Sequence, residues 1–276
     1  MSDLAILKAP HKTIPVIHVA SKLQKTAIIL GISSDIGLGI AERLTKDGWR
    51  VIGVGRTKVW DVDFYWSNLS SGTINTVAST LRNEGIRWDL FISAVGTTEP
   101  IGKFFDLDFN EWERSVIINA TAQLRFLHAI WGLKSDKADI MFFAGGGTNG
   151  PFRNYSAYCV SKIALIKMCE LLHDENPDDN FFIIGPGYVK TKIHQETIRA
   201  AEKAGDNFKS TMAKLEGPGT PIEDIYNHLK WCMKQGCSVI GGRNTATLHD
   251  PWWIADGDLP DRLRNDKDAY RLRRKM

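Results

Sequence analysis

The sequence lacks the features that mark several large classes of protein. Its 276 residues include four cysteines, which form no Cys-x-x-Cys pair and no cluster with histidine at zinc spacing. No apolar run approaches the roughly 18 residues of a membrane span. The N-terminus has neither the basic start nor the apolar core of a signal peptide. We therefore expect a cytoplasmic protein with buried free thiols, no metal site and no membrane segment.

Strong charge of one sign is also missing. The net charge is +3, and the charge-rich end of the chain (261–276) carries a single aromatic residue, Tyr270, and no known nucleic-acid-binding module. Nucleic-acid binding is therefore not predicted, and we expect a solvated terminal helix there. The sequence has no internal repeat and no low-complexity segment. With 43% hydrophobic and 24% charged residues it has the composition of a globular protein with a full core.

Short apolar runs alternate with amphipathic segments along the chain. This alternation predicts an α/β fold, a doubly wound parallel sheet of the Rossmann type in a single domain. We expect an extension over 1–24, the domain over 25–250 with a substrate-binding segment at 192–220, and a tail over 251–276. The predicted strands are 26–30, 50–54, 60–64, 88–93, 139–144, 180–184 and 238–240, and the predicted helices are 40–46, 73–83, 111–131, 155–172, 192–216 and 222–235.

The second and third predicted strands leave no room for a helix between them. Parallel strands normally need about a dozen residues for a helical crossover. We therefore expect either a loop between 54 and 60 or a marginal third strand.

A glycine-rich loop follows the first predicted strand and opens the first helix. Glycines there permit a tight turn, and the amides of the helix N-terminus face a pyrophosphate group. Gly31, Ile36 and Gly37 are therefore predicted to bind a dinucleotide. Ser33 and Ser34 either donate to phosphate or ribose, or cap the helix.

The end of the second strand has no acidic residue to bind a ribose 2′-hydroxyl. Gly55 leaves room there, and Arg56 offers a planar cation suited to a phosphate group. This pattern predicts NADP(H) as cofactor, with NAD(H) possible, unless Arg56 is simply a solvated loop residue. Asp63 ends the third predicted strand, where it either binds the adenine amino group or caps a turn.

Tyr158 and Lys162 lie four residues apart in one predicted helix, and so share a face. A free tyrosine titrates near ~10, and a neighbouring cation lowers that pKa. The pair could therefore exchange a proton with a carbonyl or alcohol oxygen.

In this order, the motifs resemble those of the short-chain dehydrogenases/reductases over about residues 25–245. The resemblance rests on Gly31 and Gly37, the run 93–96, Asn119, the Tyr158–Lys162 pair and the run 186–191. It implies that Tyr158 is the general acid or base, that Lys162 holds the nicotinamide ribose and lowers the Tyr158 pKa, and that Asn119 anchors a water. The further cofactor contacts that it implies are Ala94, Val95, Gly96, Pro186, Gly187, Val189 and Thr191.

The sequence departs from this family in places. Asp35 replaces a loop glycine, where we expect it to cap the helix, and Ser93 begins an altered strand end whose bracing hydrogen bonds are lost or replaced. Gly145 stands where the family has a catalytic serine, 13 residues before Tyr158. The substitute donor is Thr148, Asn149, a backbone N–H of the glycine run or a substrate hydroxyl.

The resemblance implies an oxidoreductase that interconverts a ketone and a secondary alcohol, on a sugar-like or other polar substrate. An epimerase or dehydratase with tightly held NAD(P), and a binding protein that has lost turnover, remain alternatives. A homodimer or homotetramer built through the long helices is also implied. His194, Gln195 and Glu196 either contact substrate or lie on a solvated face, and Trp252 and Trp253 either stack on a ligand or lie at an interface.

Overall fold

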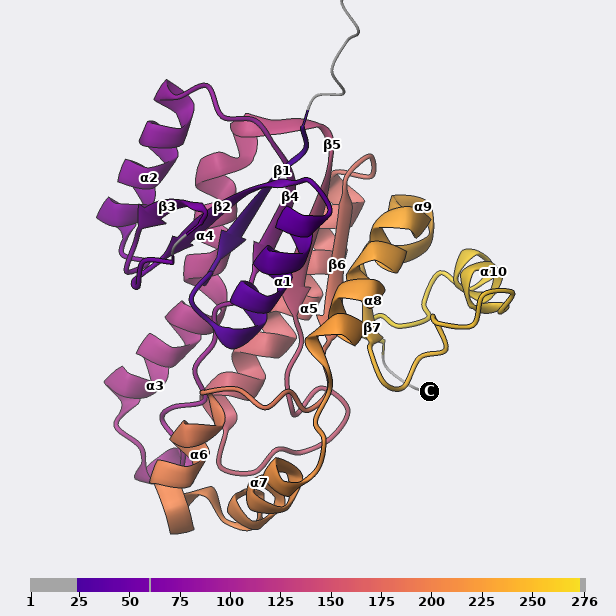
Figure 1. Ribbon diagram of the computed structural model, residues 1–276. Coiled ribbons are helices and arrows are strands. Elements are labelled where there is room, and N and C mark those ends of the chain that lie inside the picture. The colour runs from indigo at the N-terminus through magenta and orange to yellow at the C-terminus, as the bar shows by residue number, and fades with distance from the viewer. Residues whose placement is uncertain (1–23, 60, 274–276) are drawn as a thin grey trace, which may run out of the picture.

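The computed structural model describes residues 24–59 and 61–273, and these contain one seven-stranded sheet (Figure 1). All neighbouring strands are parallel, in the order β3-β2-β1-β4-β5-β6-β7. The direction of this order reverses between β1 and β4, where doubly wound sheets bind their ligands. The strands are β1 (Thr26–Leu30), β2 (Arg50–Gly55), β3 (Asp63–Trp66), β4 (Trp88–Ser93), β5 (Lys134–Phe143), β6 (Asn180–Gly185) and β7 (Arg243–Ala246).

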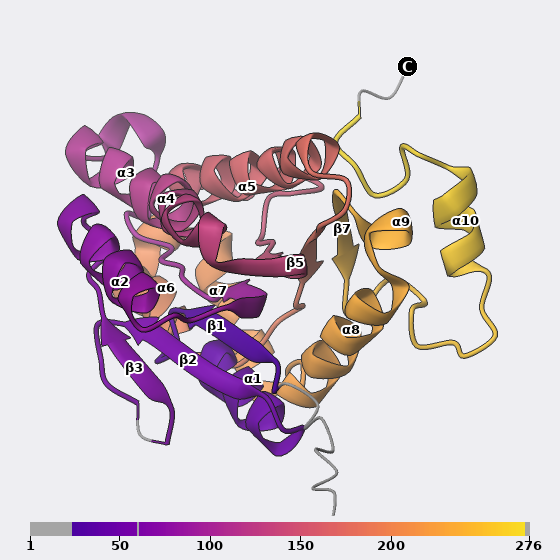
Figure 2. The ribbon, with the colours of Figure 1, turned by 90° about the horizontal axis from the view of Figure 1, so that it is seen from above.

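Helices cover both faces of the sheet (Figure 2). One face packs against α2 (Ser71–Asn83), α4 (Ala122–Ile130) and α5 (Ser156–Glu175), and the other against α1 (Asp35–Lys46) and α8 (Ile222–Gln235). The predicted Rossmann-type fold is confirmed. In the part of the chain that the structure describes, no helix is both long and apolar enough to cross a bilayer.

Helix α1 begins five residues earlier than predicted. The Ser34 side chain accepts a hydrogen bond from Gly37 N at 3.0 Å and caps the helix at that point. Asp35 is the first helical residue, so the prediction that it is the cap was wrong. Its carboxylate instead binds Lys192, which follows β6.

The predicted helix 111–131 is continuous but not regular. It begins as α3 (Phe109–Val116), passes through one π turn (Ile117–Thr121) and continues as α4. The π turn contains Asn119, and such turns often occur at functional sites.

The third strand begins three residues later and ends two residues later than predicted, and it pairs with β2 in parallel. Asp63 opens it, because an ion pair with Arg50 at 2.7 Å binds its carboxylate to β2. The described part of the link between β2 and β3 contains no helix, as we predicted.

The last strand was predicted wrongly. Residues Cys237–Ile240 form the short helix α9, and the strand is β7, at the polar run Arg243–Ala246. Periodicity cannot separate helix from strand in so short an apolar run. At this edge of the sheet, only alternate residues of the strand (Arg243 and Thr245) are buried.

Two further segments differ from prediction. The helix 192–216 is divided into α6 (His194–Ala200), a 3₁₀ turn (Ala201–Ala204) and α7 (Asp206–Glu216), with Gly205 at φ 59° between the last two. The tail is not a solvated helix, because α10 (Leu259–Asn265) buries Leu259 and Leu263.

After α10 the chain runs along the outer edge of β7. Asn244 N donates to Tyr270 O at 2.9 Å. The buried Arg243 guanidinium donates to the carbonyl oxygens of Leu263 at 2.5 Å, Asp266 at 3.0 Å, and Ala269. The tail therefore covers an edge strand that would otherwise expose unpaired backbone groups.

Candidate active site

A large cleft of about 1830 Å³ opens at the carboxyl ends of the strands. The loops that follow β1, β2, β4, β5 and β6 line it, together with α6 and α7. Figure 1 shows α6 and α7 on this side of the sheet, beyond the strand ends. Because these loops and helices meet there, residues far apart in sequence share one cavity.

The glycine-rich loop forms one wall of the cleft. Gly31 has φ 81°, and a Cβ there would lie 2.9 Å from the backbone of Ala94. A Cβ at Gly37 would lie 2.6 Å from Gly31 O, so this glycine lets the helix pack against the loop. Among the described residues, the amides of Asp35 and Ile36 have no hydrogen-bond acceptor. The loop therefore presents free donors at a helix N-terminus, the arrangement that binds phosphate.

The outer end of the cleft lies beyond β2 and β3. Arg56 lines it and is exposed. Asp63 does not line the cleft, because it opens β3 and pairs with Arg50, so its assignment to adenine binding is corrected. Ser67 and Asn68, which follow the true end of β3, lie there instead. The shift of the strand explains why the sequence pattern missed them.

The altered end of β4 is braced by a residue that we did not predict. Ser93 Oγ donates to Gln123 Oε1 at 2.7 Å, and Gln123 Nε2 donates to the carbonyl oxygens of Asn119 at 2.7 Å and Val95 at 3.3 Å. Ser93 and Gln123 are both buried. The bracing hydrogen bonds are therefore replaced, not lost.

Asn119 is fully buried behind the cleft wall. Its side chain accepts from Thr97 N at 2.9 Å and donates to Thr97 O at 2.8 Å. These bonds tie the π turn to the loop after β4. The anchored water that the resemblance implies stays a prediction.

Tyr158 and Lys162 face the cleft from the first turns of α5, with Lys162 Nζ 5.7 Å from the centre of the Tyr158 ring. Burial lowers the pKa of Lys162 to about 8. Burial also raises the pKa of Tyr158, and Cys159 and Glu196 act in the same direction. The expected lowering of the Tyr158 pKa by Lys162 is therefore not present in the ligand-free protein, where desolvation dominates.

The glycine run after β5 packs directly beneath Tyr158. A Cβ at Gly145 would lie 2.6 Å from Cε1 of Tyr158 and closer still to its Oη. The tyrosine hydroxyl thus occupies the space of a side chain at position 145. Thr148 Oγ1 donates to Gly145 O at 2.9 Å and closes the turn.

The Glu196 carboxylate binds helix α6 to the loop that follows β4. Glu196 Oε2 accepts from Thr98 N at 2.5 Å and from Thr98 Oγ1 at 2.7 Å, and Thr97 Oγ1 donates to the same carboxylate. The buried Tyr155 hydroxyl lies 2.8 Å from Thr197 Oγ1. His194 bonds to Val189 O at 2.8 Å. Gln195 is exposed and does not line the cleft.

Trp252 and Trp253 lie outside the cleft. Trp252 stacks on His228 with ring centres 4.6 Å apart, and its Nε1 donates to Thr247 O at 2.9 Å. Trp252 therefore packs within its own chain, whereas Trp253 is 54% exposed. Neither lines the cleft.

Most of the residues predicted for the site share this one cavity. Gly37 and Asn119 support its walls from behind, and Asp63 lies apart from it. The cleft is lined by Gly31, Ser33, Ser34, Ile36, Arg56, Ala94, Val95, Gly96, Thr148, Tyr158, Lys162, Pro186, Gly187, Val189 and Thr191.

The cleft fits a dinucleotide on structural grounds. It runs from the exposed Arg56 past the free amides of Asp35 and Ile36 to Lys162, across the point where the sheet order reverses. Gly31 and Gly37 have no side chain at the two points where the loop packs most closely against neighbouring backbone.

Solved structures of short-chain dehydrogenases have the same fold. A short-chain dehydrogenase/reductase from Saccharomyces cerevisiae aligns with a TM-score of 0.71 at 18% identity, covering 83% of this chain and 98% of that one. A short-chain dehydrogenase from Shigella flexneri in complex with NADP aligns with a TM-score of 0.67 at 19% identity, covering 81% and 96%.

Related proteins are also identified by sequence. An uncharacterized oxidoreductase of Schizosaccharomyces pombe is 30% identical over 192 residues, which cover 66% of this chain and 77% of the relative. A benzil reductase ((S)-benzoin forming) of Bacillus subtilis is 23% identical over 209 residues, or 70% and 86%. The family profile described as short chain dehydrogenase matches residues 65–202, which are 138 of the 276 residues. The chain therefore belongs to the short-chain dehydrogenase/reductase family of oxidoreductases.

Proposed function

We propose that the protein is an NADP(H)-dependent oxidoreductase that interconverts a ketone and a secondary alcohol. The observation that carries this proposal is the placement of Tyr158 and Lys162 in the same cleft as a phosphate-binding loop. The bound nicotinamide would supply or accept the hydride. The protein's part is to orient the reactants and to handle the proton.

Tyr158 is the proton donor in the reducing direction. Its raised pKa keeps the phenol protonated at neutral pH, so the proton is available to the carbonyl oxygen. In the oxidising direction the phenol must accept the proton. Lys162, whose pKa of about 8 leaves it mostly charged at neutral pH, would then stabilise the phenolate.

We propose a preference for NADP(H) over NAD(H). Arg56 is exposed at the cleft mouth, where Gly55 places no side chain, and neither residue is acidic. A guanidinium group binds phosphate with two parallel hydrogen bonds.

The substrate that we propose is polar and sugar-like. Helix α7 turns Asn207, Ser210, Thr211 and Lys214 toward the cleft, at the spacing of one helical face. Hydroxyl, amide and ammonium groups in that position suit a substrate with several oxygens.

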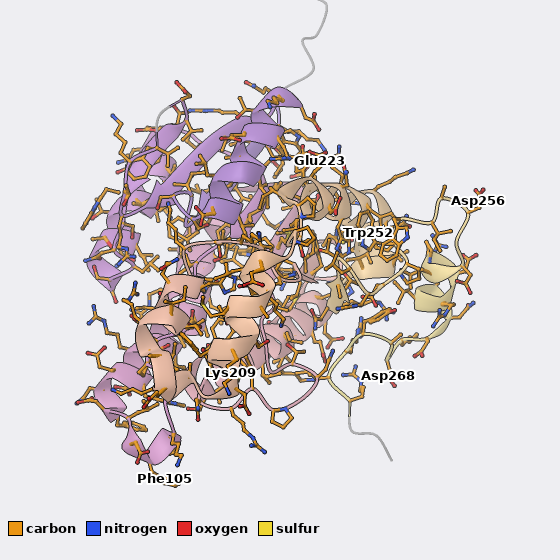
Figure 3. All side chains as sticks on the ribbon, turned by 60° about the horizontal axis from the view of Figure 1, so that its bottom comes forward. Phe105, Lys209, Glu223, Trp252, Asp256 and Asp268 are labelled. Atoms are coloured by element: carbon orange, nitrogen blue, oxygen red, sulfur yellow. The ribbon has the colours of Figure 1, made fainter. Side chains whose placement is uncertain are left out.

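We also propose a homodimer. Apolar side chains are exposed along the outer side of the two long helices, where α3, α4 and α5 lie together in Figure 2. Figure 3 shows Phe105 at the outer tip of this region. We call this set the apolar helix surface: Phe105 (95% exposed), Phe109 (60%), Ile117 (46%), Val160 (49%) and Leu171 (43%).

The test of the enzymatic proposal is the Tyr158→Phe variant. Purified protein is incubated with NADPH and a panel of benzil and ketoses, and consumption of reduced nicotinamide is followed by absorbance. We expect turnover by the wild type and a fall of about 10²–10⁴-fold in the variant, because a general acid is lost. NADPH binding, measured by fluorescence, should change little.

Gly145 favours one other candidate, a dinucleotide-binding protein without turnover. That function predicts tight NADPH binding and no consumption with any member of the panel. Wild type and Tyr158→Phe that turn over equally fast would instead reject the role of Tyr158.

A further inference from the structure

Three consecutive backbone N–H groups at the catalytic end of the cleft have no acceptor within the described chain. The N–H groups of Gly145, Gly146 and Gly147 donate to no backbone or side-chain atom, although the carbonyl oxygens of Gly145 and Gly146 accept hydrogen bonds. The preceding amide, Ala144 N, still belongs to the sheet and donates to Ile184 O at 3.0 Å. Gly145 and Gly146 both line the cleft, and the first of them touches Tyr158.

Packing disfavours a side chain at each of the three glycines 145–147. A Cβ at Gly146 would lie 3.1 Å from the Phe152 ring. Gly147 has φ 91°, and a Cβ there would fall against Cys159 Sγ. The side chains of Phe152, Tyr158 and Cys159 therefore pack directly against bare backbone. The turn is held close to Tyr158, and its amides stay uncovered.

The neighbouring side chains are less suited to replace a serine hydroxyl. The Thr148 proton is engaged by Gly145 O at 2.9 Å. The Asn149 side chain lines the cleft but is four residues further along the turn than position 145. No side chain at 145 itself is possible while Tyr158 keeps its position.

We infer that a peptide N–H of Gly145 or Gly146 is the second hydrogen-bond donor to the substrate oxygen, beside the Tyr158 hydroxyl. This inference rests on the proposed function. The N–H only donates a hydrogen bond. The proton that neutralises the substrate oxygen comes from Tyr158, and the hydride goes to the carbonyl carbon. A preorganised amide of this kind replaces a side-chain donor without side-chain entropy to lose.

The experiment removes one N–H at a time. Glycolic acid is incorporated by ribosomal suppression at 145 or at 146, so that an ester oxygen replaces the amide and the side chain is still a hydrogen atom. The matched control is the same replacement at Gly150, which is exposed, does not line the cleft and has open space around it. The amides removed support no fold, so the melting temperature should not change.

With benzil as the probe, we expect kcat to fall about 10²–10³-fold at 145 or at 146, as for removal of one oxyanion donor. KM for benzil and the NADPH dissociation constant should change little, and the control should match the wild type. The second readout is the amide proton shift of Gly145 and Gly146 when benzil joins the NADP⁺ complex, which cannot react. We expect one of them to move downfield.

The outcomes separate this inference from the proposed function. If Tyr158→Phe lowers turnover but neither ester does, the inference is overturned and the proposed function stands. If kcat of Thr148→Val or Asn149→Ala falls by about 10²–10³-fold while kcat of the ester variants does not, a side chain is the donor. If benzil is not turned over, the ketose of the panel that is turned over fastest becomes the probe, and an unmoved pair of amide signals in its complex with NADP⁺ overturns the inference.

Discussion

At the scale of single residues, the site holds a charge that the fold does not need. Lys162 is 4% exposed, and the structure gives it no carboxylate partner among the described residues. Burying an unpaired ammonium group lowers stability. Such a residue is best explained by a ligand that restores its interactions, here the ribose hydroxyls and the reacting tyrosine.

Replacing Lys162 with methionine should therefore stabilise the ligand-free protein. Its pKa is lowered from 10.5 to about 8, so between these values the unfolded chain binds more protons than the folded one. Wild-type stability should rise as pH increases from 8 to 10.5, and Lys162→Met should abolish that rise. Below pH 8 the variant should be more stable by up to about 3 kcal/mol. Urea unfolding at several pH values measures this.

The exposed Lys209 on α7, labelled in Figure 3, provides the control. Lys209→Met should leave the pH dependence as in the wild type. Equal stability of wild type and Lys162→Met at pH 7 would contradict the burial argument.

Arg56→Ala tests the cofactor preference. A charge-assisted hydrogen bond contributes about 1.5–3 kcal/mol, so we expect NADPH to bind at least about tenfold more weakly. NADH binding should change by less than a factor of about two. Fluorescence titration of both cofactors measures the ratio, with the exposed Arg82→Ala on α2 as control. An equal loss for both cofactors would place Arg56 outside the 2′-phosphate site.

At the scale of elements, the turn after β5 and the start of α5 fit together tightly. Gly145→Ser should disturb this fit, because Tyr158 already fills the space. We expect a loss of about 1–3 kcal/mol of unfolding free energy, typical of overpacking, and no gain in turnover. Thermal unfolding of Gly145→Ser and of Gly150→Ser, where nothing lies within 4 Å, provides a matched pair. A Gly145→Ser variant of unchanged stability and higher kcat would contradict this prediction.

A side-chain pair that leaves one buried oxygen without a hydrogen bond links strands β5 and β6. Asn180 Nδ2 donates to Asp139 Oδ1 at 2.7 Å, while Asn180 Oδ1 is buried without a donor. Burial raises the pKa of Asp139 to about 6. The folded protein therefore binds an extra proton between about pH 4 and 6, and stability falls as pH rises through this range.

Asp139→Asn should remove this penalty. The new amide could also donate to Asn180 Oδ1, which now lacks a partner. We expect the variant to be about 1–3 kcal/mol more stable at pH 7 and no more stable at pH 4. Asp136→Asn, at an exposed position of the same strand, is the control for denaturant unfolding at the two pH values. A gain that does not depend on pH would point away from the Asp139 charge.

The sequence predicts buried elements better than exposed ones. Apolar runs such as 88–93 mark a strand completely, because burial on both faces leaves a continuous signal. The edge strands β3 and β7 are only partly buried, so their positions along the chain were misplaced, and the role given to Asp63 failed with that of β3. The Gln123 brace and the Glu196 contact with Thr98 join distant segments, and no local pattern encodes them.

At the scale of the whole molecule, the apolar helix surface should be an interface between two copies. Leu171→Glu should shift the mass measured by light scattering toward one chain, because a buried carboxylate opposes association. Met212→Glu on α7 is a matched control, since both residues are 43% exposed. A wild type with the mass of one chain, or equal dissociation by both variants, would contradict the proposed dimer.

The edge of the sheet at β7 has a consequence for the order in which the newly made chain folds. The Arg243 guanidinium donates to carbonyl groups that lie 20 to 26 positions later, at Leu263, Asp266 and Ala269. These residues leave the ribosome after β7, and the earlier part of a chain generally folds first. Strand β7 and its covering segment therefore settle only when both have emerged, onto a sheet whose other strands form earlier.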